Sequence, residues 1–174
     1  TRLMNPLEDI LKVYPPEEVA FVSFTRKGSY EGRDRAMEKF GLKEKQFPYF
    51  RTIHSIAFRD LEMSKYDMIS KKHYKEFSAA MGMNFVGYYT EDFINNDDKY
   101  LFYESLRLNN PKAADKMSLG LDHRIVGMVH NNYEKFKKYV AVKDFDDLIV
   151  EFIIKNEPLP VRIAIIDEAQ DLTS

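Results

Sequence analysis

Two adjacent carboxylates follow an apolar run near the end of the chain. Residues 163–166 are all apolar, and Asp167 and Glu168 come directly after them in the stretch IAIIDEAQDLTS. A buried parallel strand that ends in this way places both carboxylates at the carboxyl edge of a sheet, where open α/β sheets bind their ligands. One carboxylate there can hold Mg²⁺, and a second can orient and polarise an attacking water. The stretch therefore predicts part of a site for phosphoryl transfer.

Each polar residue of this stretch receives a predicted role. Asp167 is the expected magnesium ligand, and Glu168 is expected to activate the water. Gln170 lies two residues beyond Glu168 and could contact the γ-phosphate, so Asp167 and Gln170 are predicted nucleotide contacts. The alternative is an exposed Asp-Glu turn at a helix start, where carboxylates favour the helix dipole. Four apolar residues followed by D-E-A-Q-D favour the catalytic interpretation.

Apolar patterns indicate the elements that must position these residues. Runs at 19–24 and within 159–167 are typical of strands buried on both faces, and YFRTIHS supplies a shorter strand between them. Gly41 is a typical helix stop, so the helix before it is expected to end there. The helices expected at the two ends of the chain cover 3–13, 29–40, 55–63 and 144–156.

The middle of the chain, residues 64–143, has a different character. It is rich in Lys, Tyr, Met and Asn, and a break at 109–111 interrupts its helical patterns. Those patterns cover 67–80, 98–108 and 123–139. We therefore predict an α/β core built from residues 1–63 and 144–174, with a mostly helical lobe inserted between them. A single α+β domain is the alternative.

Composition limits the class of protein. Of the 174 residues 44% are hydrophobic, which is enough for a real core, and the net charge of -2 excludes a globally basic nucleic-acid coat. The 26 Lys and Arg residues could still form a local basic groove. There is no cysteine, no apolar stretch long enough to cross a bilayer and no signal-peptide pattern. We expect a cytoplasmic protein that does not enter membranes, from a bacterium or a phage.

The acidic stretch resembles a known motif. IAIIDEAQDLTS is similar to the Walker B segment of superfamily 1 helicases of the UvrD/Rep type, whose pattern is D-E-x-Q-D. Position 169 is often aromatic in that family, and Ala169 is a smaller variant. The resemblance implies a P-loop NTPase-like, RecA-like parallel sheet, with ATP and Mg²⁺ as cofactors.

A second stretch, FVSFTRKGSYEGRDRA, resembles the T-F-T-N-K-A-A segment of the same family, whose loop touches single-stranded DNA. The resemblance implies that Phe24 stacks on a base, which contributes about 1–3 kcal/mol, and that Thr25, Arg26 and Lys27 contact phosphates. The departures are Arg26 in place of Asn, and Gly28 and Ser29 in place of two alanines. Alternatively, Phe24 is a core residue and the basic pair lies in a solvated turn.

Two further stretches complete the resemblance. RTIHSIAFRDL is similar to the family's T-F-H-S segment, so Thr52, His54 and Ser55 are predicted to reach a phosphate from a helix start. Thr52 or Ser55 could equally be a plain helix cap. DFDDLI resembles a D-F-x-D-L-L segment, in which we expect Asp144 to cap a helix whose Phe145 and Leu148 dock it on the core. The middle of the chain matches the family's inserted lobe only in size and helical character.

One half of the nucleotide site is absent from these residues. No G-x-x-x-x-G-K-[ST] loop occurs, although the helix at 3–13 resembles the one that follows that loop in the family. Thr1 is therefore expected to be the last residue of the loop, whose hydroxyl contacts Mg²⁺, or the residue after it. The chain is expected to be a fragment, with the phosphate loop before it and a second motor domain beyond Ser174.

The predicted function is that of a parent DNA helicase, which couples ATP hydrolysis to movement on single-stranded DNA and to unwinding of forked DNA. The 174-residue fragment alone is expected to be inactive. One alternative is another P-loop ATPase of DNA repair, packaging or transport. Others are a non-catalytic DNA-binding or protein-interaction module that lacks the phosphate loop, and a purely structural α/β domain.

Overall fold

The computed structural model describes residues 4–23, 25–87, 97–109, 111–118 and 121–167. The chain divides into two compact units. The first contains the beginning of the chain up to Met63 and the end of the chain from Leu148 onward. The second runs from Ser64 to Asp147. None of the described helices is long and apolar enough to cross a membrane.

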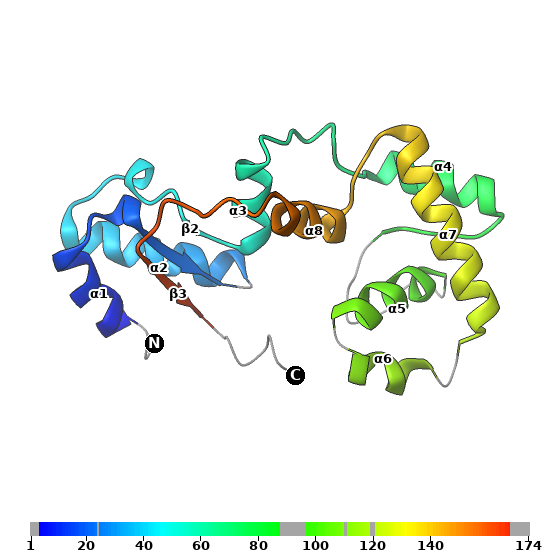
Figure 1. Cartoon of the computed structure of the whole chain (residues 1–174), viewed down its shortest axis with the longest axis horizontal. Helices are drawn as coiled ribbons and strands as arrows, with labels where there is room; N and C mark the ends of the chain where they lie inside the picture. Colours follow the sequence, from blue (N-terminus) through cyan, green and yellow to red (C-terminus); the bar gives the residue numbers. More distant parts are fainter. Residues whose placement is uncertain (1–3, 24, 88–96, 110, 119–120, 168–174) are drawn as a thin grey trace. The chain divides into compact units, whose positions relative to one another are not determined.

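A parallel three-stranded sheet organises the first unit. Its strands are β1 (Val19–Val22), β2 (Phe50–Arg51) and β3 (Ile163–Ile166), in the order β2-β1-β3 (Figure 1). The central strand β1 is almost fully buried, as its continuous apolar sequence predicts. The α/β class is confirmed, and the sheet with its helices is consistent with an incomplete RecA-like core.

The last strand is less buried than its sequence predicts. Ile163 and Ile165 are partly covered, whereas Ala164 and Ile166 are exposed, and Ile166 keeps 46% of its surface. Among the described residues β3 pairs only with β1, so it lies at the edge of the sheet. Ile165 packs against the core around Phe21, and no described element covers the other face. The prediction of a strand buried on both faces was therefore wrong for β3.

Two helices near the start of the chain pack with this sheet. Helix α1 (Met4–Val13) contributes Leu7 to a core that also contains Phe21 and Phe50. Helix α2 (Arg26–Phe40) ends at Gly41, whose φ of 65° is left-handed, as predicted. However, α2 begins three residues earlier than expected, because Thr25 caps it: the threonine hydroxyl accepts a hydrogen bond from the Gly28 amide.

The remaining helices of the first unit lie next to β2 and β3 along the chain, one after β2 and one before β3. Helix α3 (Ile53–Asp60) comes after β2 and buries Ile56 and Ala57. Helix α8 (Phe145–Lys155) leads toward β3 and buries Leu148 completely. The other apolar residues of α8 are mostly exposed, because the described elements cover only its Leu148 face.

The second unit is helical and has its own aromatic core. Its helices are α4 (Lys71–Met81), α5 (Asp98–Asn109), α6 (Pro111–Ser118) and α7 (His123–Val140). Phe77 lies at the centre, with the rings of Phe85, Tyr133 and Phe136 within 5.4 Å of its own, centroid to centroid. Helix α6 was not predicted, because Pro111 indicated only a break. Proline is well tolerated at the first position of a helix.

The start and end of the second unit are joined through the backbone. The Lys143 amide donates to the Asp67 carbonyl at 2.8 Å, and the Ile69 amide donates to the Lys143 carbonyl at 2.8 Å. Residues 67–70 therefore form a turn and a bridge instead of the helix start predicted there. Helix α4 begins at Lys71, after Ser70 and His73 form a reciprocal cap.

Candidate functional site

The ends of the three strands form one row across the sheet. Val22, the last residue of β1, pairs with Arg51 of β2 on one side and with Ile166 of β3 on the other. Each group of candidate residues follows one member of this row. Thr25, Arg26 and Lys27 follow β1, Thr52, His54 and Ser55 follow β2, and Asp167 follows β3. The topology therefore brings all three groups to the carboxyl edge of the sheet, where ligands bind in open α/β folds.

Asp167 is held at this edge by the backbone. Its amide donates to the Val22 carbonyl at 2.8 Å, which continues the β1–β3 ladder one residue beyond the strand. The residue is partly buried. Its carboxylate thus starts from a fixed position beside the end of β1. The other candidates of the acidic stretch, Glu168 and Gln170, lie outside the described residues, as do Thr1 and Phe24.

The first turn of α2 brings a cap, two cations and free amides together. Thr25 Oγ1 accepts from the Gly28 amide at 3.0 Å. Arg26 and Lys27 are exposed in the first turn, where the helix also presents amides without intrahelical partners. Such a terminus favours anions through its amides and its dipole. The alternative interpretation of the basic pair as a solvated turn is right about the exposure of both residues and wrong about the turn, since both are helical.

Ser23 and Gly28 support this turn, and neither residue is among the candidates predicted from the sequence. Ser23 is buried, and its hydroxyl accepts from the Thr25 amide at 3.3 Å. A Cβ atom at Gly28 would lie only 2.5 Å from Ser23 Oγ and 3.1 Å from Thr25 Oγ1. An alanine at position 28 would therefore require the Ser23 side chain to shift. The sequence signal for this close contact is the glycine itself, because glycine is unfavourable within a helix and Gly28 lies in the first turn of α2.

The residues after β2 have mainly local partners. Thr52 Oγ1 accepts from the Ser55 amide at 3.3 Å, so Thr52 is the cap of α3, one of the two interpretations left open by the sequence. Arg51 Nη1 lies 3.5 Å from Ser55 Oγ, which makes the Ser55 hydroxyl a weak acceptor. His54 is partly buried near the same helix start.

A buried lysine lies among three carboxylates in the second unit. Lys137 on α7 lies 2.8 Å from Glu134, 2.8 Å from Asp144 and 2.6 Å from Asp147, and its side chain is only 4% exposed. Burial opposes the charge, but the three carboxylates outweigh it and hold the pKa of Lys137 above its ordinary value. The Tyr133 ring adds a cation–π contact at 5.0 Å.

This cluster is structural rather than metal-binding. The carboxylates of Glu134, Asp144 and Asp147 lie close enough together to hold a cation. The Lys137 ammonium already supplies that charge at hydrogen-bond distance from all three. This cluster could not be predicted from the sequence, because its members lie up to thirteen residues apart on two elements.

The start of α8 confirms two of three expectations for the DFDDLI stretch and corrects the third. Asp144 Oδ1 accepts from the Asp147 amide at 2.9 Å, and Asp147 Oδ2 accepts from the Asp144 amide at 3.0 Å. Asp144 is therefore the predicted cap, within a reciprocal pair. Leu148 is fully buried, as expected for a docking residue. Phe145 is 56% exposed, so its prediction as a core contact was wrong: it is the first residue of α8, and more than half of its surface stays in solvent.

Comparison with known proteins gives a distant relationship. No family model matches the chain. The chain is 25% identical over 175 residues to the ATP-dependent DNA helicase Rep of Escherichia coli, and equally similar to that of Salmonella typhimurium. These matches cover 91% of the chain and 26% of each relative, so the chain spans about a quarter of their length. The similarity supports a distant relationship to helicases of the UvrD/Rep type.

Proposed function

We propose that this chain forms part of the ATP-driven motor of a DNA helicase. The observation that carries the proposal is the row formed by Arg51, Val22 and Ile166, because all three groups of candidate residues follow it. The similarity to the Rep helicases over most of the chain supports the same assignment. The activity would belong to a longer protein that contains these residues, since the relatives are about four times as long.

The residues after β3 fit a magnesium nucleotide in their chemistry. Carboxylate and amide oxygens are the hard donors that Mg²⁺ prefers, and Asp167 is fixed at the sheet edge by its backbone. Bound MgATP would supply a metal that neutralises charge on the transferring phosphate. Asp167 would hold the metal, Glu168 would orient the attacking water, and Gln170 would contact the terminal phosphate. Thr1 is the remaining proposed nucleotide contact.

The helix starts after β1 and β2 would hold single-stranded DNA. Exposed Arg26 and Lys27 supply charge, and the first-turn amides of α2 supply donors for phosphate oxygens. Phe24 would stack on a base. Thr52, His54 and Ser55 would extend the phosphate contacts from the next strand end. Because the three strand ends are neighbours, DNA and nucleotide would bind at one edge of the same sheet.

The test requires a protein that contains this chain together with a phosphate loop and a second motor domain. Glu168→Gln should lower DNA-stimulated ATP hydrolysis by about 10²–10⁴-fold while nucleotide binding is retained, because only water activation is removed. Strand displacement on a forked duplex should fall in parallel. Hydrolysis without strand displacement by the unsubstituted protein would instead indicate another DNA-dependent ATPase. Full activity of the Glu168→Gln protein would refute the assigned role.

The 174-residue chain alone should hydrolyse no ATP. Its sequence contains no loop with a lysine to cradle the phosphates, and these contacts supply much of the electrostatic stabilisation in phosphoryl transfer. A phosphate-release assay with and without single-stranded DNA measures this directly. DNA-stimulated release by the isolated chain would contradict the proposal.

A further inference from the structure

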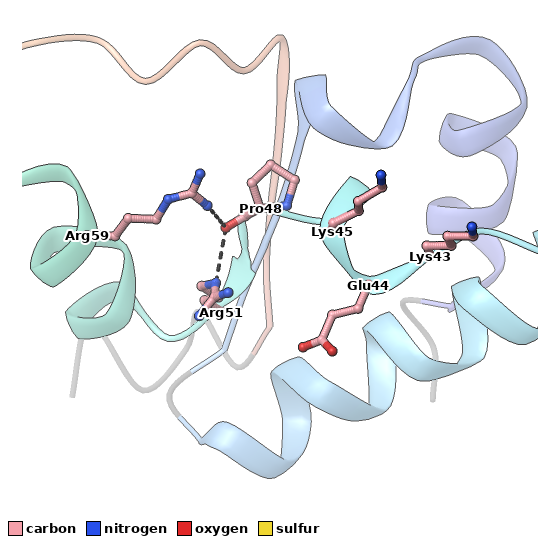
Figure 2. A pocket seen from close by; sticks show the side chains of 6 residues that line it. All are labelled: Lys43, Glu44, Lys45, Pro48, Arg51 and Arg59. Carbon is pink, nitrogen blue, oxygen red and sulfur yellow. Dashed lines mark hydrogen bonds between the residues drawn. The ribbon is translucent and has the colours of Figure 1, made fainter.

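A basic hollow lies in the first unit, beside the segment that leads into β2 (Figure 2). Its volume is about 570 Å³. Its lining residues come from the short helical turn before β2, from the end of β2 and from α3: Lys43, Glu44, Lys45, Pro48, Arg51 and Arg59. Four of these six side chains are cationic, on a chain whose net charge is -2. The hollow therefore concentrates positive charge locally.

The single carboxylate of the basic hollow is already engaged. Arg33 Nη1 lies 2.5 Å from Glu44 Oε1, and in Figure 2 the Glu44 side chain points toward α2. The nearby carboxylate of Asp60 is paired with Lys155 at 2.9 Å. In the described parts of the chain no carboxylate lies within ion-pair distance of Lys43, Lys45, Arg51 or Arg59. Four like charges without a counterion favour an anionic ligand.

The two arginines are oriented by one backbone oxygen. Arg51 Nε and Arg59 Nη1 both donate to the Pro48 carbonyl, at 3.2 and 3.4 Å (Figure 2). Both bonds are long for an N–H···O contact, and each guanidinium keeps further N–H donors. A phosphate offers charged oxygens that match the planar guanidinium fork and give shorter bonds. The Pro48 carbonyl thus holds the two guanidinium groups near each other and leaves most of their N–H donors available to a ligand.

From these contacts we infer that the basic hollow binds backbone phosphates of the nucleic acid held at the sheet edge. This inference rests on the proposed function. Arg51 links the two places, because it is the last residue of β2 and its Nη1 also reaches Ser55 Oγ at 3.5 Å. A nucleic-acid strand that contacts Thr52 and Ser55 would reach Arg51 next. Beyond Arg51 it would reach Arg59, Lys43 and Lys45.

Several features favour a polymer over a small free anion. The cations come from three separate elements, and the hollow is much larger than one phosphate group. It contains no aromatic or apolar platform for a base or a sugar except Pro48, so the contacts would be to the backbone and independent of sequence. An acidic protein segment is the competing macromolecule, and the test below separates it.

The experiment measures binding of a fluorescent single-stranded oligonucleotide to the full 174-residue chain by anisotropy, over a series of salt concentrations. Lys43→Gln with Lys45→Gln, and separately Arg59→Gln, should each weaken binding several-fold at low salt. Each lost phosphate contact should reduce the slope of log K against log salt by about 0.7. Arg51 is left intact because it also contacts Ser55, which belongs to the proposed DNA site. Lys135→Gln with Lys138→Gln, exposed on α7, is the charge-matched control and should change neither quantity.

The outcomes separate this inference from the proposed function. If Arg26→Gln with Lys27→Gln weakens binding but the hollow variants do not, the inference fails and the proposed DNA site stands. If only the hollow variants weaken binding, the inference stands and the proposed site at α2 fails. No binding by the unsubstituted chain contradicts both. Displacement of the oligonucleotide by millimolar inorganic phosphate would assign the hollow to a free anion. Displacement by polyglutamate but not by inorganic phosphate would assign it to an acidic protein.

Discussion

Gly32 of α2 allows the helix to lie close to the sheet. A Cβ atom at Gly32 would lie 2.8 Å from the Phe21 ring, which is buried and stacks on Phe50 with ring centroids 5.7 Å apart. The ring cannot move without disturbing the sheet. Gly127 on α7 is the opposite case, because an added Cβ there meets nothing within 4 Å. The same substitution should therefore have opposite effects at the two positions.

Gly32→Ala should lower the free energy of unfolding by about 1–3 kcal/mol, since a methyl group overpacks the contact between α2 and β1. Gly127→Ala should raise it by up to about 1 kcal/mol, because alanine loses less conformational freedom in a helix. Urea unfolding followed by circular dichroism measures both. Equal effects at the two positions would contradict the close contact at Gly32.

Lys137 shows how much one buried charge depends on its partners. Lys137→Met should destabilise the chain toward the lower end of about 3–5 kcal/mol, because three carboxylates lose their cation while Glu134 and Asp147 keep some contact with water. Lys135→Met, on the exposed side of α7, is the matched control and should change stability little. Urea unfolding at neutral pH provides the comparison. A loss of similar size in the control would assign the effect to helix propensity.

The contribution of Lys137 should also depend on pH in a defined direction. Its pKa is raised in the folded chain, so the charged form binds its proton more tightly there than in the unfolded chain. The stabilisation is then complete below the unfolded pKa of about 10.4 and is lost as pH rises through the folded pKa. The difference in unfolding free energy between the unsubstituted chain and Lys137→Met should be constant from pH 7 to about 10 and shrink above it. An increase above that pH would refute the ion cluster as its source.

At the scale of elements, the start of α2 combines a structural and a proposed binding role in Thr25. Its hydroxyl caps the helix, and its neighbours are proposed to contact DNA. Thr25→Ala should cost about 0.5–2 kcal/mol of stability through loss of the cap. Thr25→Asp should keep the cap but place a negative charge among the proposed phosphate contacts, so that stability is retained and oligonucleotide binding falls. Unchanged binding by a folded Thr25→Asp chain would argue against DNA at this helix start.

Local signals predicted most elements, and their failures have physical causes. Gly41 ended α2 as expected, and Asp144 capped α8, because such residues act on the backbone beside them. The predicted start of α2 was wrong because the Thr25 hydroxyl, predicted as a phosphate contact, caps the helix. Helix α6 was missed because a proline that breaks one helix can begin another.

Tertiary features were less predictable than elements. The exposure of β3 depends on what covers the sheet edge, which no pattern within IAII can report. The Lys137 cluster and the basic hollow depend on charges brought together from separate elements. Parallel strands end at the same edge of a sheet, so the shared location of Thr25, Ser55 and Asp167 could be anticipated from sequence, whereas the order of the strands could not.

At the scale of the whole molecule, each unit has a separate core. Phe50 is fully buried in the first and Phe77 almost fully buried in the second. Phe50→Ala and Phe77→Ala should each cost about 3–5 kcal/mol locally. Hydrogen exchange measured on peptides should show faster exchange confined to the unit that carries the substitution, since different units can open separately. Equal acceleration in both units would show that they unfold as one.

The three carboxylates around Lys137 also make its amine unreactive toward acylating reagents. An amine attacks an acylating reagent only in its neutral form and only when the reagent can reach it. Lys137 is both held in the protonated state and covered, whereas Lys135 and Lys138 on the same helix face solvent. Brief treatment with an amine-reactive label should modify those two lysines and spare Lys137 until the second unit opens. The rate at which Lys137 becomes labelled would then report the rate at which the second unit opens.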